Sequence, residues 1–264
     1  MTPGELYQAG KLKEAVTAAL EGVKKHPTDF QRRGQLCELL CLSGDLERAD
    51  RQLDTIGQQD PQAVVSISLW RQLIRAETAR QEVFAQGRAP EFLGEPSPHL
   101  QLYLRALVAL RSGEQDEAAT LLSEAEDSRP KPVGTCDGQP FDDFRDLDDR
   151  LAGFWEVLTS TGKYYWIPLE RIRVAELRAP ERPRDLLWRQ AYLSVIDGPE
   201  GEVYLPTIYP GTRETGDEQL QLGRGTNWRE SPSGVVQGEG LKMLLVGEED
   251  KSILEIQHLD WEVS

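Results

Sequence analysis

The chain has 264 residues, 45 of them acidic and 30 basic, so its formal charge at pH 7 is −15. This length allows one or two domains with a hydrophobic core, and the acidity excludes a nucleic-acid-binding surface, because phosphate binding needs concentrated positive charge. No apolar run approaches the roughly 18 residues of a membrane span, and residues 1–10 lack a signal-peptide pattern. The three cysteines suit a reducing compartment without disulfides, so we expect a cytoplasmic protein that binds neither membranes nor nucleic acid.

The first half of the chain contains a repeat with a period of 34 residues. Two complete copies carry a glycine, a leucine, an alanine and a proline at the same offsets: Gly10, Leu12, Ala15 and Pro27, then Gly44, Leu46, Ala49 and Pro61. A partial third copy has Gly113, Ala118 and Pro130. The glycine permits the positive φ that ends the first helix of a pair, the alanine lets the second helix pack closely, and the proline ends that second helix. This pattern predicts helix pairs like those of tetratricopeptide repeats.

Helices without the repeat signature are predicted between the second and third copies. Residues 62–87 carry apolar side chains at helical spacing, and Pro96-Ser97-Pro98 opens another helix with leucines at positions 100, 104, 107 and 110. Stacked helix pairs bend into a concave face that holds a peptide or a helix. Cys37 and Cys41 lie one helical turn apart, but no second pair of ligands accompanies them, so we expect buried thiols rather than a metal site.

The sequence pattern changes near residue 130, from helical repeats to short strands, and this change predicts two domains, residues 1–130 and 131–264. Pro130-Lys131-Pro132-Val133-Gly134 is typical of a linker. Residues 1–130 hold 20 acidic and 15 basic side chains (net −5), whereas residues 131–264 hold 25 and 15 (net −10). The excess acid therefore lies mainly in the second domain, and we expect the helical domain to hold a partner by apolar contact more than by charge.

The second domain begins with an acidic segment, Phe141 to Arg150. Its aspartates at positions 142, 143, 146 and 149 form the one candidate cluster for a divalent cation. The spacing and the glycine of a calcium-binding loop are absent, and aspartate is also common in turns and at helix starts. A metal site and a capped acidic turn are the two interpretations of this segment.

Short strands with glycine-rich turns are predicted after the acidic segment. Residues 163–168 have strand-forming composition, and residues 191–196 and 202–205 form a hairpin around Asp197-Gly198-Pro199-Glu200-Gly201. Residues 241–246 and 252–256 form a second pair around Gly247-Glu248-Glu249-Asp250. The chain is therefore predicted to be an α+β protein, with a helical repeat domain followed by a smaller β-rich domain that contains a twisted antiparallel sheet.

Catalytic motifs do not assemble in this sequence. No Gly-x-Ser-x-Gly elbow occurs, and the three histidines are scattered. The segment Leu222 to Trp228 has glycines like those of a phosphate-binding loop, but it lacks the P-loop lysine and the dinucleotide spacing. We predict a protein without catalytic residues, cofactor or metal, in which an Arg–Gly turn braces Trp228 against the sheet.

Five short motifs in the second half resemble the ImpE/TagJ/SciE family of type VI secretion accessory proteins. They are Phe144, Asp146, Leu147, Asp149 and Leu151; Gly162-x-Tyr164-x-Trp166-Ile167-Pro168; Asp185-Leu186-x-Trp188; Gly201-x-Val203-x-x-Pro206-x-x-Tyr209; and Leu222-Gly223-Arg224-x-Thr226-x-Trp228. The resemblance extends over the whole chain. It implies a cytoplasmic adaptor that binds a helix near the N-terminus of the small contractile-sheath subunit and modulates sheath assembly or turnover by a ClpV-type ATPase.

The candidate partner-binding residues are aromatic and arginine side chains from both domains: Trp70, Tyr103, Arg105, Trp166, Trp188, Arg224 and Trp228. Core packing is the alternative role for each of these aromatic residues. The alternative function is a metal-dependent hydrolase that uses the aspartates of residues 142–149. A scaffold that binds another secretion component through its repeats is a third hypothesis, which differs from the first only in the partner.

Overall fold

The structure is a computed structural model that describes residues 1–262, apart from the side chain of Pro61. Its α-helices are α1 (Pro3–Gln8), α2 (Leu12–Lys25), α3 (Phe30–Ser43), α4 (Leu46–Gln59), α5 (Val64–Gln86), α6 (Pro98–Ser112), α7 (Gln115–Ser128) and α8 (Glu218–Gln221). Its strands are β1 (Gly134–Cys136), β2 (Gln139–Phe141), β3 (Phe144–Asp146), β4 (Phe154–Leu158), β5 (Tyr164–Pro168), β6 (Ile172–Leu177), β7 (Trp188–Val195), β8 (Glu200–Pro206), β9 (Thr226–Glu230), β10 (Val236–Gly240), β11 (Met243–Val246), β12 (Glu249–Ser252) and β13 (His258–Trp261). Apart from the short α8, the α-helices come first and the strands second, which confirms the predicted α+β class.

Helices α1 to α4 are the two complete copies of the repeat. Gly10 follows α1 with φ of 76°, and Gly44 follows α3 with φ of 84°, a conformation that glycine adopts without a Cβ clash. Asp29 and Asp45 begin α3 and α4, and the carboxylate of each accepts a hydrogen bond from a backbone N–H of the first turn. The local pattern of the sequence therefore specifies where these helices start and stop.

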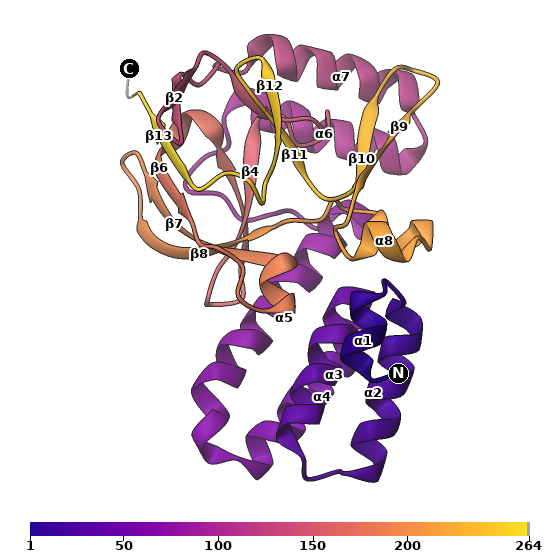
Figure 1. Cartoon of the computed structure of the whole chain (residues 1–264). Coiled ribbons are helices and arrows are strands. Elements are labelled where there is room, and N and C mark those ends of the chain that lie inside the picture. Colours follow the sequence, from indigo (N-terminus) through magenta and orange to yellow (C-terminus); the bar gives the residue numbers. More distant parts are fainter. Residues whose placement is uncertain (263–264) are drawn as a thin grey trace.

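Helix α5 connects the stacked helices to the sheet. Its N-terminal part packs against α4, and its C-terminal part reaches β4 and β5 (Figure 1). Trp70, Leu73 and Ile74 are buried along it, as are the charged side chains of Glu77 and Arg80. The same helix therefore belongs to the core of the helical part and to that of the β-rich part.

Helices α6 and α7 form the predicted third pair, but they lie apart from the first two. Gly113 separates them with φ of 81°, and Ala118 is fully buried, as the repeat pattern predicts. The Tyr103 ring of α6 packs against Gly153 and meets the ring of Phe154 edge-on at 5.4 Å. The pair therefore covers the β-rich part, at the opposite end of the molecule from α1 to α4 (Figure 1). Helix α7 ends at Ser128 and β1 begins at Gly134. The division into domains 1–130 and 131–264 remains a prediction.

Within residues 1–262, the β-rich part contains three antiparallel sheets. The largest has the order β2-β1-β13-β6-β7-β8-β4-β5, the second β12-β11-β3, and the third β10-β9. The predicted hairpin around residues 197–201 is β7–β8. The second predicted pair also forms, but its second strand is β12, at Glu249–Ser252 rather than 252–256, because the tight turn needs only Gly247 and Glu248.

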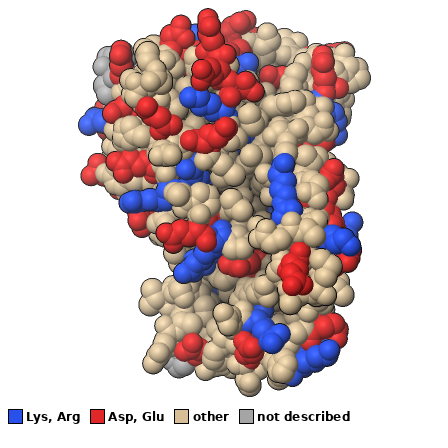
Figure 2. Space-filling model, viewed as in Figure 1, with Lys and Arg blue, Asp and Glu red and all other residues tan. Residues whose placement is uncertain are grey.

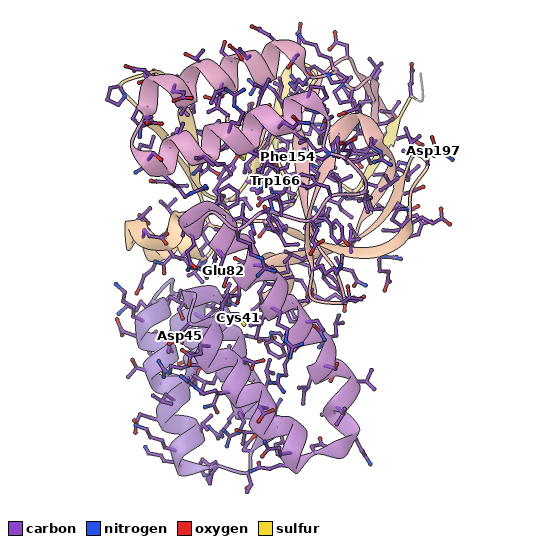
Figure 3. All side chains as sticks on the ribbon, turned by 180° about the vertical axis from the view of Figure 1, so that it is seen from behind. Cys41, Asp45, Glu82, Phe154, Trp166 and Asp197 are labelled. Atoms are coloured by element: carbon purple, nitrogen blue, oxygen red, sulfur yellow. The ribbon has the colours of Figure 1, made fainter. Side chains whose placement is uncertain are left out.

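Aromatic rings fill the space between the first two sheets. Phe144 and Trp261 have ring centroids 5.4 Å apart, and Trp155 lies 5.8 Å from Phe144 and 5.6 Å from Trp261, all edge-on. A second stack, Phe154 on Trp166 at 3.9 Å, lies beneath α6 and α7 (Figure 3). Burial of such large rings supplies much of the hydrophobic stabilisation of this part.

Candidate functional site

A cleft of about 540 Å³ lies between the helical and β-rich parts. One wall is the end of α3 and the C-terminal half of α5, and the other is the loop 208–214 that follows β8. Figure 2 shows the narrowing of the molecule at this level, with side chains of both charges around it. The volume falls within the roughly 300–1,000 Å³ of typical ligand pockets, which is enough for several side chains of a partner.

The cleft combines apolar surface with charges of both signs. Phe84, Ile208 and Tyr209 line it together with charged groups of both walls and of the segment before β4: Glu77, Arg80, Arg150, Arg213 and Glu214. The guanidinium groups of Arg80 and Arg150 each lie 6.0 Å from the centre of the Phe84 ring. Such a lining suits an amphipathic segment that carries charges beside its apolar face.

Below the cleft, a buried ionic network joins α5 to the sheet. Arg80 donates two hydrogen bonds to the Glu156 carboxylate of β4, at 2.8 and 2.9 Å, and a third to the Ile208 carbonyl at 2.9 Å. Lys242 lies 2.8 Å from Glu156 and 3.1 Å from Asp146. Each of these four side chains is at least nine-tenths buried. The network therefore fixes the position of α5 relative to the eight-stranded sheet, which contains Glu156, and the three-stranded sheet, which contains Asp146.

Each charged group of this network keeps its neighbours in their charged form. Burial by itself raises the pKa of Glu156, but the positive charges of Arg80 and Lys242 outweigh burial and hold that pKa far below its usual range. Burial likewise lowers the pKa of Arg80, and the facing carboxylates of Glu156 and Glu77 more than reverse this effect. Glu156 and Arg80 are therefore a charged pair at neutral pH.

The acidic segment of residues 142–149 is engaged by donors of the protein itself. Asp146 accepts hydrogen bonds from Tyr209 at 2.8 Å and from Lys242 at 3.1 Å. Asp149 accepts from the Val236 N–H at 2.6 Å, and the partly buried carboxylate of Asp143 pairs with Arg129 at 2.8 Å. Within residues 1–262, no group of three or more His, Cys, Asp or Glu side chains is placed to hold a metal ion. The geometry favours the capped turn over the metal site for this segment.

Comparisons with known proteins bear on the whole chain. The family model described as ImpE protein matches residues 138–260. The type VI secretion system accessory component TagJ of Pseudomonas aeruginosa is 33% identical over 262 residues, which cover 99% of this chain and 92% of TagJ. The chain belongs to the ImpE family. Protein VPA1032 from Vibrio parahaemolyticus, a crystal structure, is similar in fold, with a TM-score of 0.93 and 29% identity over 98% of this chain and 97% of that one.

The ImpE-like motifs of the second half contribute to the network beneath the cleft. Trp166 donates its indole N–H to the Tyr164 hydroxyl at 2.7 Å, and Tyr164 donates to Glu156 at 2.5 Å. Trp188 donates to Glu77 of α5 at 3.2 Å. These motif residues thus hold the charged groups of α5 and β4 in place.

Four of the predicted partner-binding residues are core residues. Trp70, Tyr103, Trp166 and Trp188 are 8%, 1%, 0% and 1% exposed. A side chain with so little accessible surface cannot contact a partner in this conformation, so packing is the role that the structure gives these four residues.

In the part of the chain that the structure describes, no helix is long and apolar enough to cross a membrane.

The other three predicted residues are exposed, but they do not form one cluster. Arg105 lies on α6. Arg224 donates to the carbonyl oxygens of Tyr7 and Gln8, at 2.6 and 3.0 Å, and stacks over the Tyr7 ring. Trp228 is 40% exposed and lies 5.7 Å from the ring of Tyr209, which lines the cleft. The predicted bracing of Trp228 thus involves Tyr209, while Arg224 holds the N-terminal helix.

Sequence reasoning missed the charged residues of the site. Arg80 and Glu156 are 76 positions apart, and Lys242 is 86 positions beyond Glu156. No local motif contains them. The one available signal was the pair Glu77 and Arg80, which interrupts the buried face of an otherwise apolar stretch of helix.

Proposed function

We propose that this chain is a non-catalytic accessory component of a bacterial type VI secretion system and acts in the cytoplasm. It binds a helix near the N-terminus of the small subunit of the contractile sheath, and it thereby modulates sheath assembly or turnover by a ClpV-type ATPase. The observation that supports this proposal most strongly is the 33% identity to TagJ over 99% of the chain. A likeness of this length and level includes both parts of the molecule and the cleft between them.

The cleft is the proposed position of the partner helix. A helix needs an apolar surface for one face and compatible charges for its flanks. Phe84, Ile208 and Tyr209 supply the first, and Arg150, Arg213 and Glu214 supply the second. Trp228 flanks the site through Tyr209 and is the predicted contact residue that we retain at the cleft. Arg224, which stacks over Tyr7 of the N-terminal helix, and Arg105, on α6, are retained as more remote contacts.

The alternative of a metal-dependent hydrolase has less support. The carboxylates on which it depends, those of Asp143, Asp146 and Asp149, bind Arg129, Lys242, Tyr209 and a backbone amide. Asp142 is exposed and stands apart from them. We assign no catalytic residue, and the relative is named an accessory component.

Isothermal titration of the full chain with a synthetic peptide tests the proposal. The peptide is the N-terminal helix of the small sheath subunit encoded in the same secretion cluster. We expect saturable binding, weakened about ten-fold by Glu214→Arg, because the charge change falls on the wall of the cleft. Glu202→Arg is the matched control, since Glu202 is also exposed but lies on β8 outside the cleft.

Two results contradict separate parts of the proposal. Absence of heat at about 100 μM peptide, where a micromolar complex would be saturated, overturns the choice of partner. Binding that is equally strong in wild type, Glu214→Arg and Trp228→Ala overturns the choice of the cleft.

A further inference from the structure

Strand β9 has a free edge on the outside of the molecule. It pairs with β10 along one side, with Trp228 opposite Gly238, and Figure 1 shows β9 on the outer side of this hairpin. Four of its five residues are exposed. The strand contains no proline, lysine or bulge, three of the features that protect an edge from pairing, and its charged side chains are those of Arg229 and Glu230.

The hydrogen-bond pattern of the hairpin shows which backbone groups are free. The Leu241 N–H donates to the Gly225 carbonyl, and the Ser231 N–H donates to the Val235 carbonyl, both at 2.9 Å. Because bonding alternates along an antiparallel pair, the odd-numbered residues of β9 bond to β10. The backbone groups of Thr226, Trp228 and Glu230 therefore point outward, and in residues 1–262 no group beyond β10 bonds to them.

On the opposite edge of the hairpin, all three outward N–H groups have partners. The N–H groups of Val236, Gly238 and Gly240 donate to Asp149, Asp148 and Thr212, at 2.6, 2.9 and 2.8 Å. The acidic segment thus closes one edge of this two-stranded sheet. The contrast leaves β9 as a strand edge that is open for pairing.

We propose that β9 pairs with β9 of a second copy of this chain, so that two hairpins form one four-stranded antiparallel sheet about a two-fold axis. Only outward residues can form hydrogen-bonded pairs with outward residues. A register centred on Trp228 satisfies this condition, because it pairs Trp228 with its own copy and Thr226 with Glu230 of the other copy. A two-fold axis then generates the same contacts on both sides.

The charges of β9 are compatible with this self-pairing. In the register centred on Trp228, Arg229 faces Asn227 of the other copy, and Glu230 faces Thr226. No like charges stand directly opposite one another, an arrangement that would weaken the pairing. The hairpin itself carries Arg229, Glu230 and Glu239, so the repulsion between copies comes mainly from the net charge of −15 on each chain and is screened by salt.

Sedimentation velocity of the full chain, from about 1 to about 200 μM and at about 0.05 and 0.5 M salt, tests the proposal. We expect a monomer–dimer equilibrium that shifts toward dimer at high salt. Glu230→Pro removes an outward N–H and places a ring at the free edge, where proline spares the ladder to β10, so it abolishes the dimer. Glu230→Ala keeps the N–H and keeps the dimer.

A charge pair tests the register independently. Thr226→Glu places a carboxylate opposite Glu230 of the other copy, and Thr226→Lys places an ammonium there. Both variants lose the same hydrogen bond from Thr226 to the Leu241 carbonyl, so each controls for the other. We expect the Thr226→Lys variant to dimerise about ten-fold more tightly than Thr226→Glu, because the contact between residue 226 and Glu230 of the other copy occurs twice in the dimer.

Cysteine cross-linking gives a third readout. Trp228→Cys brings two thiols together across the axis at a spacing that a disulfide spans, whereas Arg229→Cys does not, and the native Cys37, Cys41 and Cys136 are buried. A strictly monomeric protein at the highest concentration overturns the proposal. A dimer that persists in Glu230→Pro, or that cross-links equally through both cysteines, also overturns it. None of these outcomes depends on the function proposed above.

Discussion

At the scale of single residues, the aromatic and charged side chains of the ImpE-like motifs act inside the protein. Trp166, Tyr164 and Glu156 form a chain of hydrogen bonds that ends at Arg80 of α5. A buried charge is costly unless it is paired and hydrogen-bonded. Loss of one member therefore destabilises the fold through its unpaired partners.

Glu156→Gln tests this interpretation. The variant removes the charged acceptor that Arg80 and Lys242 share and leaves each with one other carboxylate, Glu77 at 3.4 Å and Asp146 at 3.1 Å. We expect it to lower the free energy of unfolding by about 3–5 kcal/mol at pH 7. Urea unfolding monitored by tryptophan fluorescence measures the change. Glu202→Gln, an exposed carboxylate on β8, is the control with an expected change near zero.

The pH dependence of stability follows from the direction of the Glu156 shift. Its pKa is lower in the folded chain than the ordinary 4.5, so its stabilising contribution is complete above that value and is lost as pH falls below it. We expect the difference between wild type and Glu156→Gln to shrink when urea unfolding is repeated between about pH 5 and pH 3. A difference that stays constant over this range contradicts the charged state of Glu156.

At the scale of elements, distant segments complete the helical repeats. Lys11 begins α2 without a side-chain cap, and Glu218 of α8 supplies the missing acceptor through bonds from the N–H groups of Leu12 and Lys13, at 3.0 and 3.1 Å. The side chains of Gln219 and Arg213 lie directly over Gly10 and Gly44. The repeat glycines therefore have two roles: they end a helix, and they leave room for the β-rich part.

Glu218→Ala tests the capping of α2 from a distance. We expect a loss of about 1 kcal/mol in the free energy of unfolding, typical of a lost N-cap, and faster hydrogen exchange at the amides of Leu12 and Lys13. Glu218→Gln retains an acceptor and has a smaller effect. Glu14→Ala is the control, because the ion pair of Glu14 with Lys11 is solvent-exposed; unchanged exchange in Glu218→Ala contradicts the cap.

At the scale of the whole molecule, the parts share contacts over a wide surface. Helix α5 enters both, α6 and α7 cover the sheet, and residues 213–224 hold the N-terminal helices. Acidic side chains gather at the end of the molecule that the β-rich part and α7 form together (Figure 2). This acidic end therefore draws on both halves of the sequence, because α7 precedes residue 130.

This sharing predicts a single cooperative unfolding transition. Helix loss by circular dichroism at 222 nm and exposure of tryptophan by fluorescence are expected to coincide, as two-state unfolding requires. The six tryptophans include buried residues of both parts, such as Trp70 and Trp155. Separate transitions for the two probes indicate instead that residues 1–130 and 131–264 unfold independently.

The sequence by itself determined the local structure. Helix ends at Gly10, Gly44 and Gly113, the β7–β8 hairpin and the α+β class follow from backbone preferences and periodicity, which act over a few neighbouring residues. The motifs likewise identified the family. Only the tertiary structure decided that α6 and α7 leave the helical stack, that Trp166 and Trp188 are core residues, and that Arg80 meets Glu156 and Lys242 beneath a cleft. These contacts join residues far apart in the chain, where packing and the pairing of buried charges, rather than any local pattern, select the partner.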